Sequence, residues 1–154
     1  MQIVIDIFTN YVLMSAVCSW LAAQILKGFT GVFKLKRFTL TEFFFGTGGM
    51  PSSHTAAVCG VATAAAVRFG FASFEFAISG VLAMIVMRDA MGMRREVGRH
   101  AKALNEIFEE LAKAKDDPEM TNKALGELVG HTPLQVFAGA FVGIGSALLL
   151  SLVL

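Results

Sequence analysis

Gly48-Gly49-Met50-Pro51-Ser52-Ser53-His54 is the stretch that decides how this 154-residue chain folds. It joins a basic segment, 34–49, to a long apolar run, 55–69. Proline favours the first turn of a helix and serine favours the cap, so we expect a helix here, capped by Ser52 or Ser53. The N–H groups and partial positive charge of a helix N-terminus suit an anion such as phosphate. His54 then lies on the first turn, either beside a bound anion or simply at a membrane interface.

The composition around this stretch is typical of a membrane protein. Hydrophobic residues make up 55% of the chain and charged residues only 16%, and the charges are confined to a few stretches. We therefore predict an all-α integral membrane bundle, with 1–154 as a single domain. About four transmembrane helices are expected, at about 3–26, 51–69, 71–88 and 133–154. Thr132 is the expected cap of the last of these, with Pro133 at its first helical position.

The most polar part of the chain lies between the third and fourth expected spans. Apolar residues recur there at helical spacing, which indicates an amphipathic helix; they are Ala101, Leu104, Ile107, Phe108 and Leu111. We predict a cytoplasmic amphipathic helical insertion at about 96–130, lying on the membrane or against the bundle. Its charges are expected to form a solvated face.

The distribution of positive charge predicts the orientation of the bundle. With four spans, 12 of the 13 lysines and arginines fall on one side of the membrane, and Arg68 is the exception. The positive-inside rule then places both long connections in the cytoplasm and both termini outside, in the cell (inner) membrane. Cys18 and Cys59 lie in apolar runs and are expected to pack as small hydrophobic residues. No nucleic-acid partner is expected, and a homo-oligomer is possible because four spans provide few helices to enclose a lipid-sized site.

Two predicted helices start at this cytoplasmic face with a histidine at the mouth, His54 on one and His131 before the other. Lys27 ends the first span at the same level, and Arg94 and Arg95 follow the third. Arginine bonds two phosphate oxygens at once, and paired histidines can divide the work of phosphoryl transfer. Paired histidines also bind metals, but the cationic surroundings favour phosphate, so we expect no metal and no cofactor.

Three motifs give the chain a resemblance to a known family. They are Gly-Gly-Met-Pro-Ser-Ser-His at 48–54, Asp89-Ala90-x-Gly92-x-Arg94-Arg95, and Gly130-His131-Thr132-Pro133. Together they resemble the divergent branch of the type 2 phosphatidic acid phosphatase superfamily, also called acid phosphatase/vanadium-dependent haloperoxidase-related, over nearly the whole chain. The resemblance implies a membrane-embedded, metal-independent phosphatase that hydrolyses a lipid phosphate or diphosphate through a phosphohistidine.

The resemblance also implies a role for each site residue. His131 would be the nucleophile and His54 the acid that protonates the leaving alcohol. The phosphoryl oxygens would be held by Lys27, Ser52, Ser53, and Arg94 or Arg95, with Asp89 and Gly49 in supporting positions. The superfamily has an aspartate to orient its nucleophilic histidine, and Gln135 stands at that place here.

Gln135 leaves alternative functions open. A glutamine can orient an imidazole, but it cannot stabilise an imidazolium by charge. One alternative is therefore a catalytically weak or inactive protein that binds phosphate or a lipid headgroup. Another is a purely structural bundle, in which His54 and His131 would lie far apart. His100 also follows Arg94 after five residues, but it belongs to the amphipathic helix and we expect it at the surface.

Overall fold

The structure is a computed structural model that describes residues 1–32, 50–115 and 131–154, without the side chains of 31–32, 93–95, 112 and 114–115. Within these ranges every regular element is a helix, and no strand occurs. The helices are α1 (Gln2–Phe8), α2 (Tyr11–Val32), α4 (Ser53–Phe69), α5 (Phe74–Met91), α6 (Met93–Lys115) and α7 (Pro133–Leu150). The predicted all-α class is confirmed for these residues.

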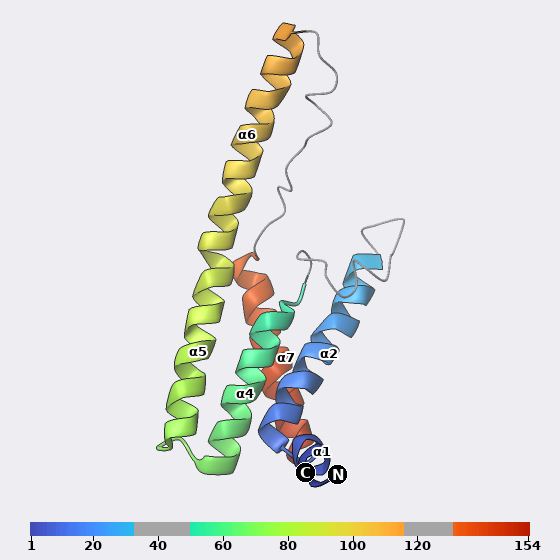
Figure 1. Cartoon of the computed structure of the whole chain (residues 1–154), viewed down its shortest axis with the longest axis vertical. Coiled ribbons are helices and arrows are strands. Elements are labelled where there is room, and N and C mark those ends of the chain that lie inside the picture. The colour runs from blue at the N-terminus through green and yellow to red at the C-terminus, as the bar shows by residue number, and fades with distance from the viewer. Residues whose placement is uncertain (33–49, 116–130) are drawn as a thin grey trace.

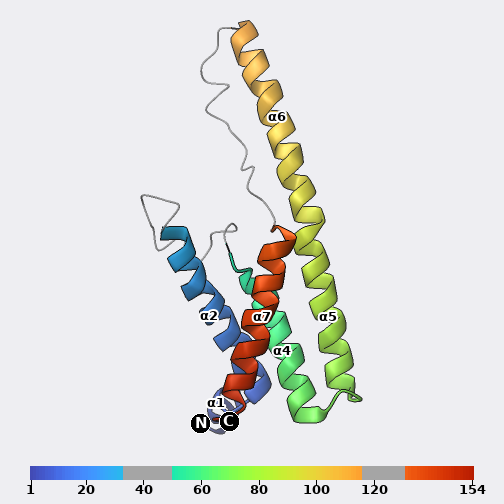
Figure 2. The ribbon, with the colours of Figure 1, turned by 180° about the vertical axis from the view of Figure 1, so that it is seen from behind.

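Four helices, α2, α4, α5 and α7, lie side by side as a bundle (Figures 1 and 2). The helix α4 lies at its centre and packs against the other three. Most of the buried residues are small, among them Ala56, Ala64 and Ala147. Small residues let helix backbones approach closely, which is how helices associate in a bilayer.

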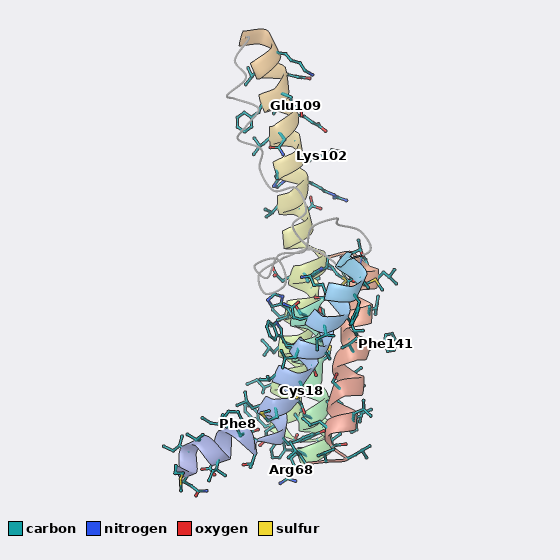
Figure 3. All side chains as sticks on the ribbon, turned by 90° about the vertical axis from the view of Figure 1, so that its right-hand side faces the viewer. Phe8, Cys18, Arg68, Lys102, Glu109 and Phe141 are labelled. Carbon is teal, nitrogen blue, oxygen red and sulfur yellow. The ribbon has the colours of Figure 1, made fainter. Side chains whose placement is uncertain are left out.

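The outer surface of this bundle suits lipid. Large apolar side chains project from it, among them Leu21, Ile85 and Phe141, and Phe141 points away from the bundle in Figure 3. Three helical stretches of the described chain are long and apolar enough to cross a membrane: Tyr11–Thr30, Phe74–Leu111 and Pro133–Leu150. The helix α4 has 17 residues, which is slightly shorter than the roughly 20 that a span requires.

The first expected span, 3–26, consists of two helices in the structure. The helix α1 ends where the N–H and hydroxyl groups of Thr9 both donate to the Ile5 carbonyl, each at 2.9 Å. The Asn10 side chain then accepts the Leu13 N–H (3.0 Å) and starts a new helix. Asparagine favours such a cap over a helix interior. The second helix, α2, continues to Val32, beyond the expected end.

The caps of α4 and α7 follow from their local sequence. Ser52 is the cap of α4, one of the two expected residues, but Pro51 lies before the cap and not in the first turn. At α7 the prediction is confirmed in full: Thr132 is the cap and Pro133 follows it at the start of the helix. Both helices therefore begin where short polar side chains satisfy their first N–H groups.

The structure describes only part of the predicted insertion. Residues 93–115 form the helix α6, while 116–130 lie outside the described residues. Rather than packing against the bundle, α6 continues close to the line of α5 and extends beyond the other helices (Figures 1 and 2). The reason is that hydrogen bonding continues across Gly92: its N–H bonds to the Arg88 carbonyl (2.8 Å) and its carbonyl accepts the Glu96 N–H (3.1 Å).

Glycines set the spacing of α7 and α4. A Cβ atom added to Gly139 would overlap the Ser52 carbonyl oxygen, and one added to Gly143 would overlap the Ala56 carbonyl oxygen. Gly139 and Gly143 are one turn apart, so together they form a flat strip on α7 against which the backbone of α4 lies. The same approach brings the N-terminus of α4 beside that of α7.

This packing predicts that Gly143→Ala destabilises the bundle. The added methyl group forces α4 and α7 apart, and overpacking of this kind costs about 1–3 kcal/mol. The melting temperature of the purified protein in detergent should fall by several degrees. Gly145→Ala is the matched control, because a Cβ atom there meets nothing within 4 Å. Equal melting temperatures for the two variants would contradict the account.

Candidate functional site

Four helix ends meet at one end of the bundle (Figure 1). The Ser52 N–H, before α4, donates to the Gln135 carbonyl in the first turn of α7 (3.0 Å). The His131 N–H, before α7, donates to the Ala90 carbonyl near the end of α5 (3.1 Å). The Thr30 hydroxyl, in the last turn of α2, donates to the Met50 carbonyl (2.5 Å). Backbone and side-chain bonds therefore join residues that are widely separated in the sequence.

His131 is held both by its backbone and by one nitrogen of its ring. Its backbone is fixed to α5, and it is only 6% exposed. Its ring atom Nδ1 lies 3.3 Å from Oε1 of Gln135. A histidine held from both its backbone and one ring nitrogen has a defined ring orientation.

The bonds at Gln135 determine which nitrogen of His131 carries the proton. Oε1 of Gln135 accepts the backbone N–H of Thr132 (2.9 Å), and the Gln135 N–H donates to the Thr132 side chain, completing a reciprocal capping box. A backbone N–H can only donate, so the side-chain atom facing it is the amide oxygen. That oxygen can only accept, so the neutral His131 carries its hydrogen on Nδ1 and its lone pair on Nε2.

Ser52 and Ser53, both predicted to bind phosphate, are buried at the start of α4. Ser52 is fully buried, and its Oγ accepts the Thr55 N–H (3.5 Å) and the Thr55 hydroxyl (3.0 Å). With its own N–H given to Gln135, Ser52 joins α4 to α7 and also caps α4. The N–H group of Ser53 then belongs to the first turn, where the helix itself supplies no acceptor for it. The start of α4 therefore offers an anion a backbone N–H donor.

Lys27 and Thr30 lie one turn apart on α2. The Lys27 side chain is half-buried, and Thr30 ties this part of α2 to the Met50-Pro51 segment that leads into α4. The tie brings this turn of α2 close to the segment that precedes α4. Lys27 was predicted and Thr30 was missed: a spacing of three residues places both on one helix face, but it does not reveal the bond from Thr30 to Met50.

His54 and Asp89 complete the described part of the predicted set. His54 is exposed on the first turn of α4, whereas His131 is buried, so the two histidines have different surroundings at the same end of the bundle. Asp89 is half-buried in the last turn of α5. It directly precedes Ala90, whose carbonyl holds His131. Asp89 is therefore close to the backbone of the candidate nucleophile.

Three predicted positions lie outside the described residues: the side chains of Arg94 and Arg95, and the whole of Gly49. The backbone of both arginines belongs to the first turn of α6, directly after α5. Within the described ranges, no group of three or more His, Cys, Asp or Glu residues gathers to hold a metal ion. The described side chains of the predicted set at this end are those of Lys27, Ser52, Ser53, His54, His131, Gln135 and Asp89, and the ammonium, hydroxyl and imidazole groups among them suit an anion.

Comparison with known proteins identifies the family of this chain. The model of the Divergent PAP2 family matches residues 8–146. An uncharacterized membrane protein of Bacillus subtilis (strain 168), YuiD, is 38% identical over 157 residues, covering 97% of this chain and 96% of its own. No solved structure matches. The match to the family model runs from the last residue of α1 into α7 and includes every predicted site residue. The chain therefore belongs to the Divergent PAP2 family and is a membrane protein of that family.

Proposed function

We propose that this protein is a membrane-embedded, metal-independent phosphatase that hydrolyses a lipid phosphate or diphosphate through a phosphohistidine on His131. The observation that carries the proposal is the pair of bonds at Gln135. The backbone carbonyl of Gln135 accepts the Ser52 N–H, which places the start of α4 beside the start of α7. Its side-chain oxygen Oε1 lies beside Nδ1 of His131. Family membership supports the same class of reaction.

The first step is an attack by His131 on phosphorus. The lone pair on Nε2 forms the N–P bond, while the bond between phosphorus and the ester oxygen breaks and its electrons leave with that oxygen. His54 gives its proton to the leaving alkoxide, so a neutral alcohol departs. The Ser53 N–H at the start of α4 and the ammonium of Lys27 stabilise the charge that develops on the phosphoryl oxygens.

The second step regenerates the enzyme. A water molecule attacks phosphorus and gives its proton to the now neutral His54. The N–P bond breaks and its electrons return to Nε2 of His131, and inorganic phosphate is released. Both steps use only groups at this end of the bundle, and neither requires a metal ion.

The orientation in the membrane completes the proposal. The helix α4 crosses as a fourth span: its 17 residues reach about 26 Å, and the capping segment supplies the remaining length. Arg68 lies at the end of the bundle near α1, and Lys102 lies beyond the opposite end (Figure 3). By the positive-inside rule the site faces the cytoplasm of the cell membrane, and both termini lie outside.

One observation favours the alternative, a protein that binds a phosphate or lipid headgroup without turnover. Gln135 provides an acceptor for His131 but no charge, so the imidazolium of the transition state lacks the support of an ionised carboxylate. The proposal and the alternative predict the same binding and differ only in turnover.

The first test is phosphate release from a lipid phosphate in the presence of a chelator. Wild-type protein should release phosphate, and vanadate, which mimics five-coordinate phosphorus, should inhibit. His131→Ala should lower the rate at least about a thousandfold, because it removes the nucleophile. His100→Ala is the matched control, since that histidine is exposed on α6. Full activity in His131→Ala would contradict the assignment.

The second test changes the charge beside His131. Gln135→Glu keeps the side-chain length that the capping box needs and adds a carboxylate that faces the Nδ1 hydrogen. We expect turnover to rise about tenfold or more, because the imidazolium gains an ionic partner. Gln135→Met, which fills a similar volume without an acceptor, should lower turnover.

Equal rates for Gln135→Glu and wild type would show that Gln135 does not act on the ring. Vanadate binding without turnover in wild type and in Gln135→Glu would favour the binding protein over the phosphatase. The melting temperatures of wild type, Gln135→Glu and Gln135→Met are measured as well, because a variant that loses the α7 cap should melt at a lower temperature than wild type.

A further inference from the structure

The helix α1 presents an apolar surface that no described part of the bundle covers. Each of its seven residues is exposed, and within the described chain it packs only against α2. Gln2 and Asp6 lie one turn apart and are joined by a hydrogen bond of 3.0 Å. The other residues are large and apolar: Ile3, Val4, Ile5, Ile7 and Phe8. The helix therefore has one narrow polar edge and a broad apolar face.

The break after α1 turns this helix away from the axis of α2. Thr9 closes α1 on the Ile5 carbonyl, and Asn10 caps α2 through the Leu13 N–H. In Figure 3, α1 projects sideways from the end of the bundle, with Phe8 close to the junction. Its axis therefore departs from the direction in which the other helices cross the membrane.

The length of α2 sets the depth at which α1 lies. Tyr11–Thr30 has 20 residues, and 20 helical residues span about 30 Å, the thickness of a hydrocarbon core. The helix α2 thus crosses the core without α1. The candidate site lies at the Thr30 end, so α1 begins at the surface of the opposite leaflet.

The lipid-facing surface of the bundle continues to this level. Phe71 and Phe74, at the turn between α4 and α5, are 78% and 75% exposed, and this turn lies at the same end of the bundle as α1 (Figure 1). Leu152 and Val153, after α7, are each 81% exposed. The apolar face of α1 therefore extends an exposed apolar surface at this end of the bundle.

We propose that α1 lies in the plane of the membrane interface, in the leaflet opposite the candidate site. Its apolar face enters the boundary between headgroups and acyl chains, and the Gln2–Asp6 edge faces the headgroups and water. A short helix with a large apolar face and a polar edge takes this position because it buries apolar area without desolvating a charge. Since α1 carries one acidic and no basic side chain, anionic lipid is not needed for this binding.

This position has a consequence for the rest of the bundle. The rigid helix α2 connects α1 at one surface with Lys27 and Thr30 near the other. An interfacial α1 therefore limits movement of α2 along the membrane normal and keeps Lys27 at the depth of the opposite headgroups. This effect of α1 is transmitted through the length of α2.

The test measures the depth of single fluorescent labels on the full-length protein in phosphatidylcholine vesicles. Cysteines replace Gln2, Ile3 or Ile7, one at a time, with Cys18 and Cys59 changed to alanine, and each carries a nitrobenzoxadiazole label. Quenching is measured with iodide in the water and with lipids that carry a spin label near the headgroup or near the chain end. Two reference labels replace Phe141, exposed on the span α7, and Lys102, exposed on α6.

The Ile3→Cys and Ile7→Cys labels should be quenched severalfold more by the shallow lipid spin label than by the deep one, and only weakly by iodide. The Gln2→Cys label should be severalfold more accessible to iodide than the Ile3→Cys label. Two results would overturn the proposal. If the labels at Ile3 and Ile7 are quenched like the Lys102 reference, α1 lies in water; if they are quenched like the Phe141 reference, it lies in the hydrocarbon core. Labels that no quencher reaches would show a protein partner and would also overturn the proposal.

A second measurement avoids the cysteine replacements. Phe8→Trp adds an indole to a chain whose single natural tryptophan is Trp20. Lipids brominated near the headgroup should quench the added emission severalfold more than lipids brominated near the chain end. Equal quenching by the two lipids, or stronger quenching by the deep one, would contradict the interfacial position.

Discussion

The contact between the start of α4 and the first turns of α7 is the constraint on which the rest of this structure depends. The Ser52 N–H bonds to the Gln135 carbonyl, and Gly139 and Gly143 allow the backbone of α4 to lie directly against α7. Because α4 also packs against α2 and α5, the position of α7 relative to α4 determines where all four helix ends meet. The candidate site is a product of this packing as much as of its own residues.

Gln135 shows how structural and chemical roles can share one side chain. Its carbonyl holds Ser52, its amide oxygen completes the cap of α7, and the same oxygen faces the ring of His131. An aspartate at this position has a shorter side chain and is not the residue type of a capping box. Glutamine therefore secures the helix start and the histidine tautomer, at the cost of the charge that a carboxylate would give.

Local sequence predicted the features that local interactions decide. The cap at Thr132 with Pro133, a cap at Ser52 or Ser53 and the helical class all follow from short-range preferences, although Pro51 lies before the cap and not in the first turn. The break at Thr9 and Asn10 was missed because the apolar run continues across it, and hydropathy alone does not register a cap. The direction of α6 was not predicted, since spacing indicates an apolar face without specifying which way the helix points.

The candidate site was only partly accessible to sequence analysis. Motifs identified His131, Gln135 and Ser52. In the structure, Ser52 and His131 both lie beside Gln135, and His131 is also bonded to the end of α5. The contribution of Thr30 could not be predicted, because its bond to the Met50 carbonyl depends on how α2 ends beside a segment 20 residues later. The arginines selected by the same motifs lie outside the described side chains.

The most direct measurement is to trap the phosphorylated residue. The protein is mixed with a lipid phosphate that carries a radioactive phosphoryl group, stopped in alkali during turnover and digested to peptides. The account predicts label on the peptide that contains His131, stable in alkali and lost in acid, as the P–N bond of a phosphohistidine requires. Phosphate release with label on another residue, or with no labelled protein at any time, would contradict it.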